Sequence, residues 1–222
     1  MRPANGTVTD GEDGFRLELA PLIADAAAFD GWTDAAVTVA AEMAGVDPQA
    51  ACFAFGGKAM TMIAAWTRAI DADMAEALPR ERLATLPIRE RIRALVEFRI
   101  DAIAGREESL RRALIEMAKP GHVAAVARLG WKSADVMWRL AGDTATDYNH
   151  YTKRATLAGI YAATLAVMAD DRSEDHADTR AFLARRIDGI MRFEKFKAQV
   201  LHPKGEHFSL TRLFGRLRYP AR

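Results

Sequence analysis

The sequence predicts an all-α protein of about ten helices. Apolar residues recur at the helical spacing i, i+3, i+4 and i+7 along almost the whole chain of 222 residues. No segment alternates apolar and polar residues over the length that a half-buried strand needs. Half of the residues are hydrophobic and 27% are charged, which is an ordinary globular composition with enough apolar residues for one generous core.

Turn residues separate the first predicted helices. Gly31 follows the first helix, and a second glycine, Gly45, ends the next. Asp47 then stands at an N-cap position, with Pro48 at the first position of the following helix. We therefore expect helices over residues 15–29, 34–44, 48–55 and 58–78.

The later helices are bounded in the same way. Pro87 opens one helix, Pro120-Gly121 separates two more, and Gly142 ends the helix that carries Trp138. No repeat of 20–50 residues recurs, which excludes a solenoid. We expect helices over residues 87–104, 106–118, 121–140, 146–170, 174–198 and 208–218.

The segment from Trp32 to Trp66 has the layout of a helix-turn-helix unit. Val37, Ala40 and Ala41 form an apolar helix face, and a glycine turn and a short second helix follow. This layout resembles the amino-terminal domain of the tetracycline-repressor fold, where a three-helix DNA reader is joined to a larger helical ligand-binding domain. We expect a disordered tail over residues 1–14 and a helix-turn-helix-like lobe over residues 15–57.

Charge is unevenly distributed along the chain, although the formal net charge is only +1. Residues 1–57 carry nine acidic residues against two arginines, and residues 180–222 carry eleven basic residues against three acidic ones. A basic end suits a phosphate-bearing partner, either a lipid headgroup or a nucleic acid.

The predicted lobe is a poor DNA reader. Residues 17–57 contain no lysine or arginine and six acidic residues, and Gln49 is the one plausible base-reading side chain of the second helix. Neutralising phosphates supplies nonspecific DNA affinity, so an acidic reader would be repelled. The pattern favours a lobe that kept the fold and lost the function, with a ligand-responsive transcription regulator as the alternative.

Cysteine usage and hydropathy bear on the compartment. The single cysteine, Cys52, excludes an internal disulfide and fits a reducing environment. The first fourteen residues resemble neither a signal segment nor a transit peptide, and no apolar run approaches the roughly 20 residues that span a bilayer. We expect a cytoplasmic protein whose contact with the inner (cytoplasmic) membrane is peripheral.

The predicted C-terminal helix is basic and amphipathic. Four apolar residues fall on one face, with arginines off that face or at its border. Such a helix suits a lipid interface, and docking on the protein body or on a dimer mate is the alternative. The linker with Pro203 and Gly205 favours a membrane-binding tail over residues 203–222. The residues expected to bind the membrane are Phe208, Leu210, Arg212, Leu213, Phe214, Arg216, Leu217 and Arg218.

The sequence offers little for catalysis. The five histidines are scattered, no Glu-x-x-His pair suits a di-iron site, and Cys52 has no obvious base partner. Gly56-Gly57-Lys58 lacks the rest of a phosphate-binding motif. We predict no catalytic residue, metal or cofactor.

Residues 138–161 form the most distinctive segment, a helix–turn–helix corner rich in aromatic and charged residues. Asp147, Tyr151 and Arg154 fall at i, i+4 and i+7 and form one stripe. This stripe is either a partner-binding patch or a structural feature in which Asp143 and Asp147 are caps, Arg154 bridges to one of them and Trp138 is core. The face expected to turn inward consists of Leu157, Ile160, Tyr161, Thr164 and Met168.

The corner also resembles a known family. The run Met137-Trp138-x-x-Ala-Gly-Asp143-x-x-Thr-Asp147-x-Asn149-x-Tyr151-Thr-x-Arg154-x-x-Leu-x-x-Ile-Tyr161 is very similar to the signature of the coenzyme Q biosynthesis accessory protein of the Coq-nine family. The likeness continues through Asp178-Thr-Arg180-x-Phe-Leu-x-x-Arg-Ile to about residue 200. It is weaker in Gly31-Trp-Thr and Phe53-x-Phe-Gly-Gly.

The resemblance implies a non-catalytic protein of the tetracycline-repressor fold that binds isoprenoid quinone intermediates or other lipids. It further implies a homodimer, a helical lipid-binding and dimerisation domain over residues 58–200, and membrane association through the C-terminal helix. The quinone precursor would be presented to the demethoxyubiquinone hydroxylase, and the inward face of the corner would line the lipid pocket. Carried over by position, the partner patch comprises Trp138, Asp143, Asp147, Asn149, His150, Tyr151 and Arg154.

One position departs from the family pattern. Members of the family carry tryptophan where this chain has His150. Histidine offers less aromatic contact area and gains charge at mildly acidic pH. We therefore expect a partner surface that is altered here or matched to a different hydroxylase.

Overall fold

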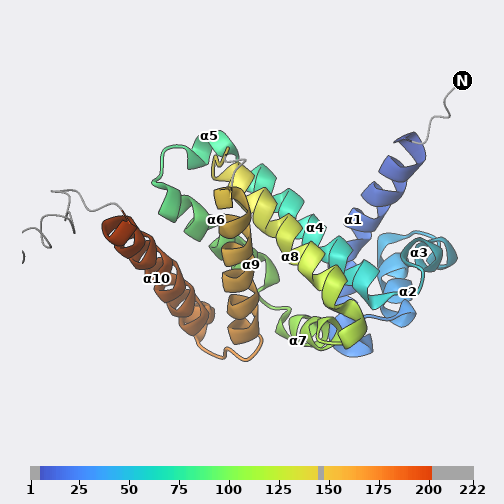
Figure 1. The fold of residues 1–222 in the computed structure, drawn as a ribbon. Coiled ribbons are helices and arrows are strands. Elements are labelled where there is room, and N and C mark those ends of the chain that lie inside the picture. Colours follow the sequence, from blue (N-terminus) through green and yellow to red (C-terminus); the bar gives the residue numbers. More distant parts are fainter. Residues whose placement is uncertain (1–5, 145–147, 202–222) are drawn as a thin grey trace, which may run out of the picture. The chain divides into compact units, whose positions relative to one another are not determined.

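The computed structural model describes residues 6–144 and 148–201, with side chains over residues 11–144 and 149–189 (Figure 1). The described residues form ten α-helices and no strand, so the predicted fold class is confirmed. The described residues divide into two compact units, one that ends at residue 184 and one that begins at residue 185. All the helices named below lie in the first unit, except for the later part of α10.

Apart from the start of the first helix, the helices of the predicted lobe have nearly the expected bounds. They are α1 (Gly6–Asp30), α2 (Asp34–Ala44) and α3 (Pro48–Phe55). The Asp47 carboxylate accepts hydrogen bonds from the backbone N–H groups of Gln49 and Ala50, at 3.1 and 3.2 Å, as its N-cap position predicts. Gly45 ends α2 at a φ of 69°, in the left-handed region that glycine adopts without strain.

The start of α1 differs from the prediction. The helix begins at Gly6, so the prediction of a disordered tail over residues 1–14 is wrong from residue 6 onward. Charged side chains hold this first part of the helix: Arg16 Nη2 lies 2.6 Å from Glu12 Oε1, and Arg68 of α4 donates to Asp13 at 3.1 Å. The second of these contacts spans 55 residues, and local sequence reasoning had no access to it.

The remaining helices make up the larger helical part. They are α4 (Ala59–Ala77), α5 (Arg80–Leu83), α6 (Ile88–Ile103), α7 (Glu107–Met117), α8 (Val123–Leu140), α9 (Tyr148–Met168) and α10 (Ala177–Leu201), with short 3₁₀ turns η1 (Pro120–His122) and η2 (Glu174–His176). The short α5 was not predicted. The predicted helix over residues 208–218 lies outside the described residues.

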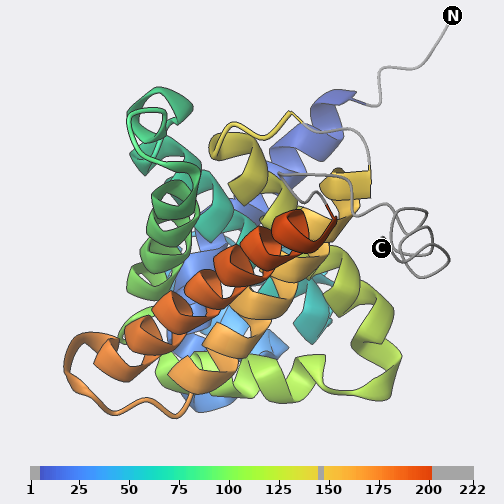
Figure 2. The same ribbon diagram turned by 60° about the vertical axis from the view of Figure 1, so that its left-hand side comes forward.

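The core of the first unit is continuous between the lobe and the larger helical part. α4 packs against α1 on one side and against α6 and α8 on the other, and α8 and α9 lie side by side (Figures 1 and 2). Trp32 of the lobe and Trp66 of α4 are buried with their ring centroids 5.4 Å apart. In the described part of the chain, no helix combines the length and the apolar composition needed to cross a bilayer.

Candidate functional site

The corner singled out by the sequence is a helical hairpin formed by α8 and α9. Backbone hydrogen bonds end α8: the N–H of Gly142 donates to Arg139 O at 3.0 Å, and that of Asp143 donates to Trp138 O at 2.9 Å. Gly142 has a φ of 92°, which explains the glycine at this position. The chain turns back at this point, and α9 packs against α8.

Arg154 lies beneath this corner, and not on its surface. Its side chain is 2% exposed, and its Nε donates to Asp135 Oδ1 of α8 at 2.6 Å. Its Nη1 donates to Asp143 Oδ2 at 3.0 Å and to the carbonyl oxygen of His150 at 3.1 Å. The expectation that Arg154 forms part of an exposed stripe is therefore wrong, because α8 covers it, whereas the alternative bridge to Asp143 is confirmed.

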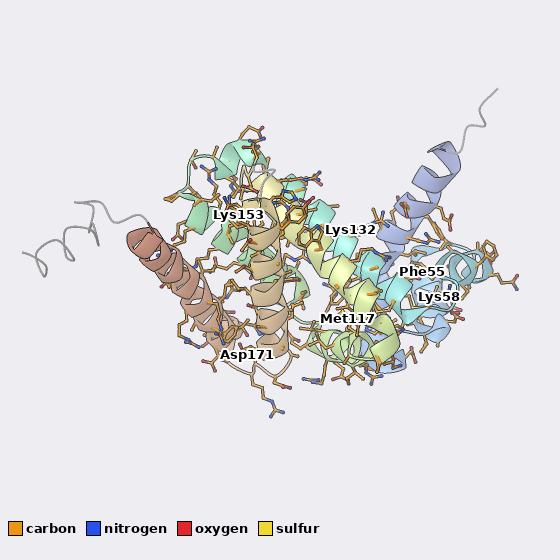
Figure 3. All side chains as sticks on the ribbon, in the orientation of Figure 1. Phe55, Lys58, Met117, Lys132, Lys153 and Asp171 are labelled. Carbon is orange, nitrogen blue, oxygen red and sulfur yellow. The ribbon has the colours of Figure 1, made fainter. Side chains whose placement is uncertain are left out.

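Asp143 is buried with Arg154 and is shared with a second cation. Its side chain is 5% exposed, and Lys153 Nζ donates to its Oδ1 at 2.8 Å. The same ammonium lies 5.4 Å from the centroid of the Trp138 ring, whose Nε1 donates to Lys153 O at 3.0 Å. Figure 3 labels Lys153 on α9, close to this end of the hairpin. Trp138 and Asp143 thus brace α8 against α9.

Above the buried ion pairs lies an exposed aromatic cluster. Tyr151 is 62% exposed, and its ring centroid lies 5.9 Å from that of Trp131 and 5.2 Å from that of His150. Trp131 and His150 are half-buried, and Asn149 is exposed beside them. We call Trp131, Asn149, His150 and Tyr151 the corner surface. Asp147, also predicted to belong here, lies outside the described residues.

Two members of this arrangement, Trp131 and Asp135, were missed from the sequence. A signal for them was present, because Trp131, Asp135 and Trp138 stand at i, i+4 and i+7 on α8. This is the same spacing as the stripe recognised on α9. Two stripes of equal period on consecutive helices of a hairpin are expected to face each other.

The predicted inward face of α9 is buried. Leu157, Tyr161, Thr164 and Met168 are each at most 7% exposed, and Ile160 is half-buried. The hydroxyl of Thr164 donates to the carbonyl oxygen of Ile160 at 2.8 Å, which satisfies this polar group within the helix. The orientation of the face is therefore as predicted.

Tyr161 of this face packs against a second buried arginine, Arg99 of α6. The Arg99 Cζ atom lies 4.5 Å from the centroid of the Tyr161 ring. Arg99 is completely buried and pairs through Nη1 with Asp71 of α4, which also accepts a hydrogen bond from Ser133 Oγ of α8 at 3.1 Å. Four helices thus contribute to one internal polar cluster, which we call the Arg99 cluster: Asp71, Arg99, Ser133 and Tyr161.

Burial and neighbouring charge shape the ionisation of the Arg99 cluster. Burial acts to lower the pKa of the Arg99 guanidinium, but Tyr161 and Asp71 outweigh it and raise that pKa above its ordinary value. Burial also raises the pKa of the Tyr161 phenol. At neutral pH the cluster therefore combines a guanidinium cation with a neutral phenol.

The sequence contained a signal for Arg99 that was not used. Residues 92, 95, 96, 99, 100 and 103 follow the spacing of a buried helix face, and all of them are buried. Arg99 is the charged residue in that otherwise aliphatic stripe. An arginine on an apolar face requires a buried partner and is a candidate functional residue.

A separate cleft of about 660 Å³ opens where the starts of α2 and α4 meet the turn between α7 and α8. It contains none of the α9 residues predicted to line a lipid pocket. Figure 3 labels Lys58, one of the residues that line the cleft. Its lining consists of Trp32, Thr33, Asp34, Gly57, Lys58, Ala59, Met60, Thr61, Glu116, His122 and Ala125.

The predicted membrane-binding residues have no structural outcome. The eight predicted membrane-binding residues between Phe208 and Arg218 lie outside the described residues. Within the described residues, no three histidine, cysteine, aspartate or glutamate side chains are grouped so that they could hold a metal ion.

Comparisons with known proteins match the corner to one family. Residues 123–194, which contain α8 and α9, match the family model described as COQ9. The chain is 34% identical over 177 residues to the ubiquinone biosynthesis protein COQ9, mitochondrial, of Rattus norvegicus, covering 77% of this chain and 56% of the relative. The human protein of the same name is 32% identical over 177 residues, with 77% and 55% covered. The chain thus spans about half the length of these relatives.

A solved structure has the same fold. The TetR transcriptional regulator of Nitrosomonas europaea superposes with a TM-score of 0.61 over 79% of this chain and 97% of its own. Its sequence identity is 22%, so this likeness concerns the fold alone. The tetracycline-repressor-like fold and the resemblance to the Coq-nine family are both confirmed.

Proposed function

Because the chain carries a COQ9 family domain, we propose that it serves ubiquinone biosynthesis as a non-catalytic accessory protein. It binds isoprenoid quinone intermediates and presents them to the demethoxyubiquinone hydroxylase at the membrane. The observation that carries this proposal is the corner surface, which lies within the matched residues and exposes aromatic side chains above buried ion pairs.

The geometry of the corner suits protein recognition. Aromatic side chains supply much contact area at a low cost in side-chain entropy, and they dominate the energetics of many interfaces. The buried Arg154 with Asp135 and Asp143 holds the two helices that carry them, so the surface is pre-organised. In this proposal Tyr151, His150 and Asn149 touch the hydroxylase, while Arg154, Asp143 and Trp138 position them.

The lipid is assigned to the inward face of α9 and its surroundings. The buried part of this face is apolar apart from one threonine and one tyrosine, and both lie deep in the helical part. Burying an isoprenoid tail there is favourable by about 0.8 kcal/mol for each methylene. The basic segment 203–222 then serves as the peripheral contact with the inner membrane, and the last long helices serve as the homodimer contact.

The alternative function, a ligand-responsive transcription regulator, has the shared fold in its favour. The helix that corresponds to a DNA reader, α3, carries no lysine or arginine, and it exposes the apolar side chain of Phe53 at 88%. Phosphate neutralisation, the main source of DNA affinity, therefore has no basis on this helix. The accessory role explains both the absence of basic residues on α3 and the exposed aromatic residues of the corner surface.

The hydroxylase interaction is tested by a pulldown with the purified hydroxylase. Tyr151→Ala is expected to lower retention at least about tenfold, as loss of a central aromatic anchor does. Phe53→Ala is the matched control, because Phe53 is an even more exposed aromatic on α3, at 88% against 62% for Tyr151, and it should leave retention unchanged. Equal retention of all three proteins would overturn the assignment of the corner surface.

The lipid role is tested by mass spectrometry of the lipids extracted from the purified full chain. We expect an isoprenoid quinone or quinone precursor at a substantial fraction of the protein concentration. Protein lacking residues 203–222 should keep this lipid and lose binding to anionic vesicles. Absence of any copurifying lipid, together with no uptake of added isoprenoid quinone, would refute the carrier role.

A further inference from the structure

The Arg99 cluster has an unsatisfied hydrogen-bonding edge in the interior of the protein. Arg99 Nε and Nη2 are buried and have no hydrogen-bond partner, while Nη1 is engaged by Asp71. A buried polar group without a partner costs about 1–3 kcal/mol, so such groups are rare in native proteins. Two unpartnered donors on the Arg99 side chain indicate a ligand that accepts their hydrogen bonds.

The two free donors form a recognisable unit. Nε–H and the adjacent N–H of Nη2 point in parallel from one edge of the planar guanidinium, which is the fork that binds two neighbouring oxygen atoms. The guanidinium lies over the Tyr161 ring, with 4.5 Å between Cζ and the ring centroid. This contact and the ion pair of Nη1 with Asp71 hold the guanidinium in place before any ligand binds.

The charge balance of the cluster restricts the ligand. Asp71 neutralises the guanidinium, since it pairs with Nη1 and is itself held by Ser133 Oγ at 3.1 Å. A carboxylate ligand would bring a second anion beside Asp71 in a buried site, where like charges repel strongly. A neutral group with adjacent oxygen acceptors fits without that penalty.

We propose that the Nε and Nη2 edge of Arg99 is the polar anchor of the lipid site and hydrogen-bonds two adjacent oxygens of an isoprenoid quinone, a ring carbonyl oxygen and the oxygen of the neighbouring methoxy group. This inference rests on the lipid-carrier function proposed above and adds the group that recognises the headgroup. Tyr161 belongs both to the Arg99 cluster and to the inward face of α9, which joins the anchor to the apolar surface. The headgroup is bound at Arg99, and the tail runs along Leu157, Thr164 and Met168.

Equilibrium dialysis of the full chain with three probes tests the anchor. The probes are a methoxy-substituted benzoquinone with an isoprenoid tail, the isoprenoid hydrocarbon of the same length, and a fatty acid of similar length. Wild type should bind the quinone about 10- to 100-fold more tightly than the hydrocarbon, as two hydrogen bonds from a charged donor allow. Arg99→Met should reduce this ratio to near one.

Arg106→Met is the control, because Arg106 carries the same fork but already donates from Nε and Nη2 to the two carboxylate oxygens of Asp25, at 2.5 and 3.2 Å. It should leave the quinone-to-hydrocarbon ratio unchanged. If Arg99→Met does not fold, Arg99→Met/Asp71→Leu removes both charges and keeps the apolar volume. A carbonyl stretching frequency that is lowered for the labelled quinone on wild type, and not on the double variant, would report the hydrogen bond directly.

Several outcomes would overturn the anchor while leaving the carrier function standing. They are equal binding of quinone and hydrocarbon by wild type, a preference that survives Arg99→Met, an unshifted carbonyl of the bound quinone, and tighter binding of the fatty acid than of the quinone. Failure of wild type to bind any of the probes would instead refute the carrier function, and the anchor with it.

Discussion

Arg154 and Arg99 are buried to nearly the same extent, at 2% and 0% exposure, but their surroundings differ. Arg154 lies between two carboxylates and a backbone carbonyl at the α8–α9 corner, whereas Arg99 has one carboxylate and an aromatic ring. The first is a braced support beneath an exposed surface. The second keeps an unused pair of donors inside the helical part.

The difference shows that the hydrogen-bond partners of a buried charged residue indicate its role. Ion pairs in a protein interior gain little net stability over apolar residues, because removing both charges from water is expensive. A complete set of partners, as around Arg154, indicates a positioning role. An incomplete set, as around Arg99, indicates a site that awaits an acceptor.

The largest loss of stability is expected from a substitution at the α8–α9 corner. Arg154→Met should lower the free energy of unfolding by about 3–5 kcal/mol, because Asp135 and Asp143 stay buried without their cation. Urea unfolding followed by circular dichroism measures it. Arg139→Ala is the control: Arg139 binds the same Asp135 at 2.8 Å but is 73% exposed, and it should cost less than about 1 kcal/mol. Equal losses would mean that burial of Arg154 does not matter.

A smaller loss is expected at Arg99. Arg99→Met should cost about 2–3 kcal/mol, less than a fully paired arginine, because the unsatisfied Nε and Nη2 disappear along with the ion pair. Arg99→Met/Asp71→Leu should recover stability to within about 1 kcal/mol of wild type. The same urea assay measures both. A double variant as unstable as the single one would contradict the view that Arg99 is retained for binding.

A smaller effect is expected at Asp171, whose carboxylate is held by neutral hydrogen-bond donors and not by an arginine. Burial opposes its ionisation, but donors from Ser173 and Thr179 at the start of α10 outweigh burial and lower its pKa well below the ordinary 3.8. Asp171→Asn should therefore cost about 1–2 kcal/mol at pH 7. Its folded-state pKa is depressed, so the stabilisation is complete above the unfolded pKa and fades as pH falls through the folded value.

The measurement is the difference in unfolding free energy between wild type and Asp171→Asn as pH falls from 7 into the acid range. That difference should stay constant to near pH 5 and then shrink. Asp170→Asn, at an 87% exposed neighbouring carboxylate, should change stability by no more than about 0.5 kcal/mol at any pH. A pH-independent difference for Asp171 would show that the carboxylate charge is not what its donors stabilise.

Sequence reasoning succeeded where the signal was local. The cap at Asp47 and the left-handed glycine at Gly45 are decided by neighbouring residues, and the structure has both. The inward face of α9 follows from helical periodicity alone, and four of its five residues are buried. The family signature at the corner is likewise a local string.

Sequence reasoning failed where a distant helix determines whether a side chain is buried. Periodicity grouped Tyr151 with Arg154, but the carboxylate of Asp135 on α8 draws Arg154 into the interior while Tyr151 stays in solvent. Arg99 needed Asp71, 28 residues away, to be recognised as half of a buried pair. One-dimensional spacing reports which side chains share a face, but not which helix covers that face.

The link between the lobe and the helical part has a consequence for cooperativity. Trp32 Nε1 donates to Ser109 O of α7 at 3.1 Å, and Ser109 Oγ donates to Ala24 O of α1, with both residues buried. Cutting the chain after α3 would therefore leave two fragments with orphaned donors and an exposed tryptophan pair. In hydrogen exchange, α1 and α7 should open together as one folding unit, so the helix-turn-helix-like lobe is not a detachable module.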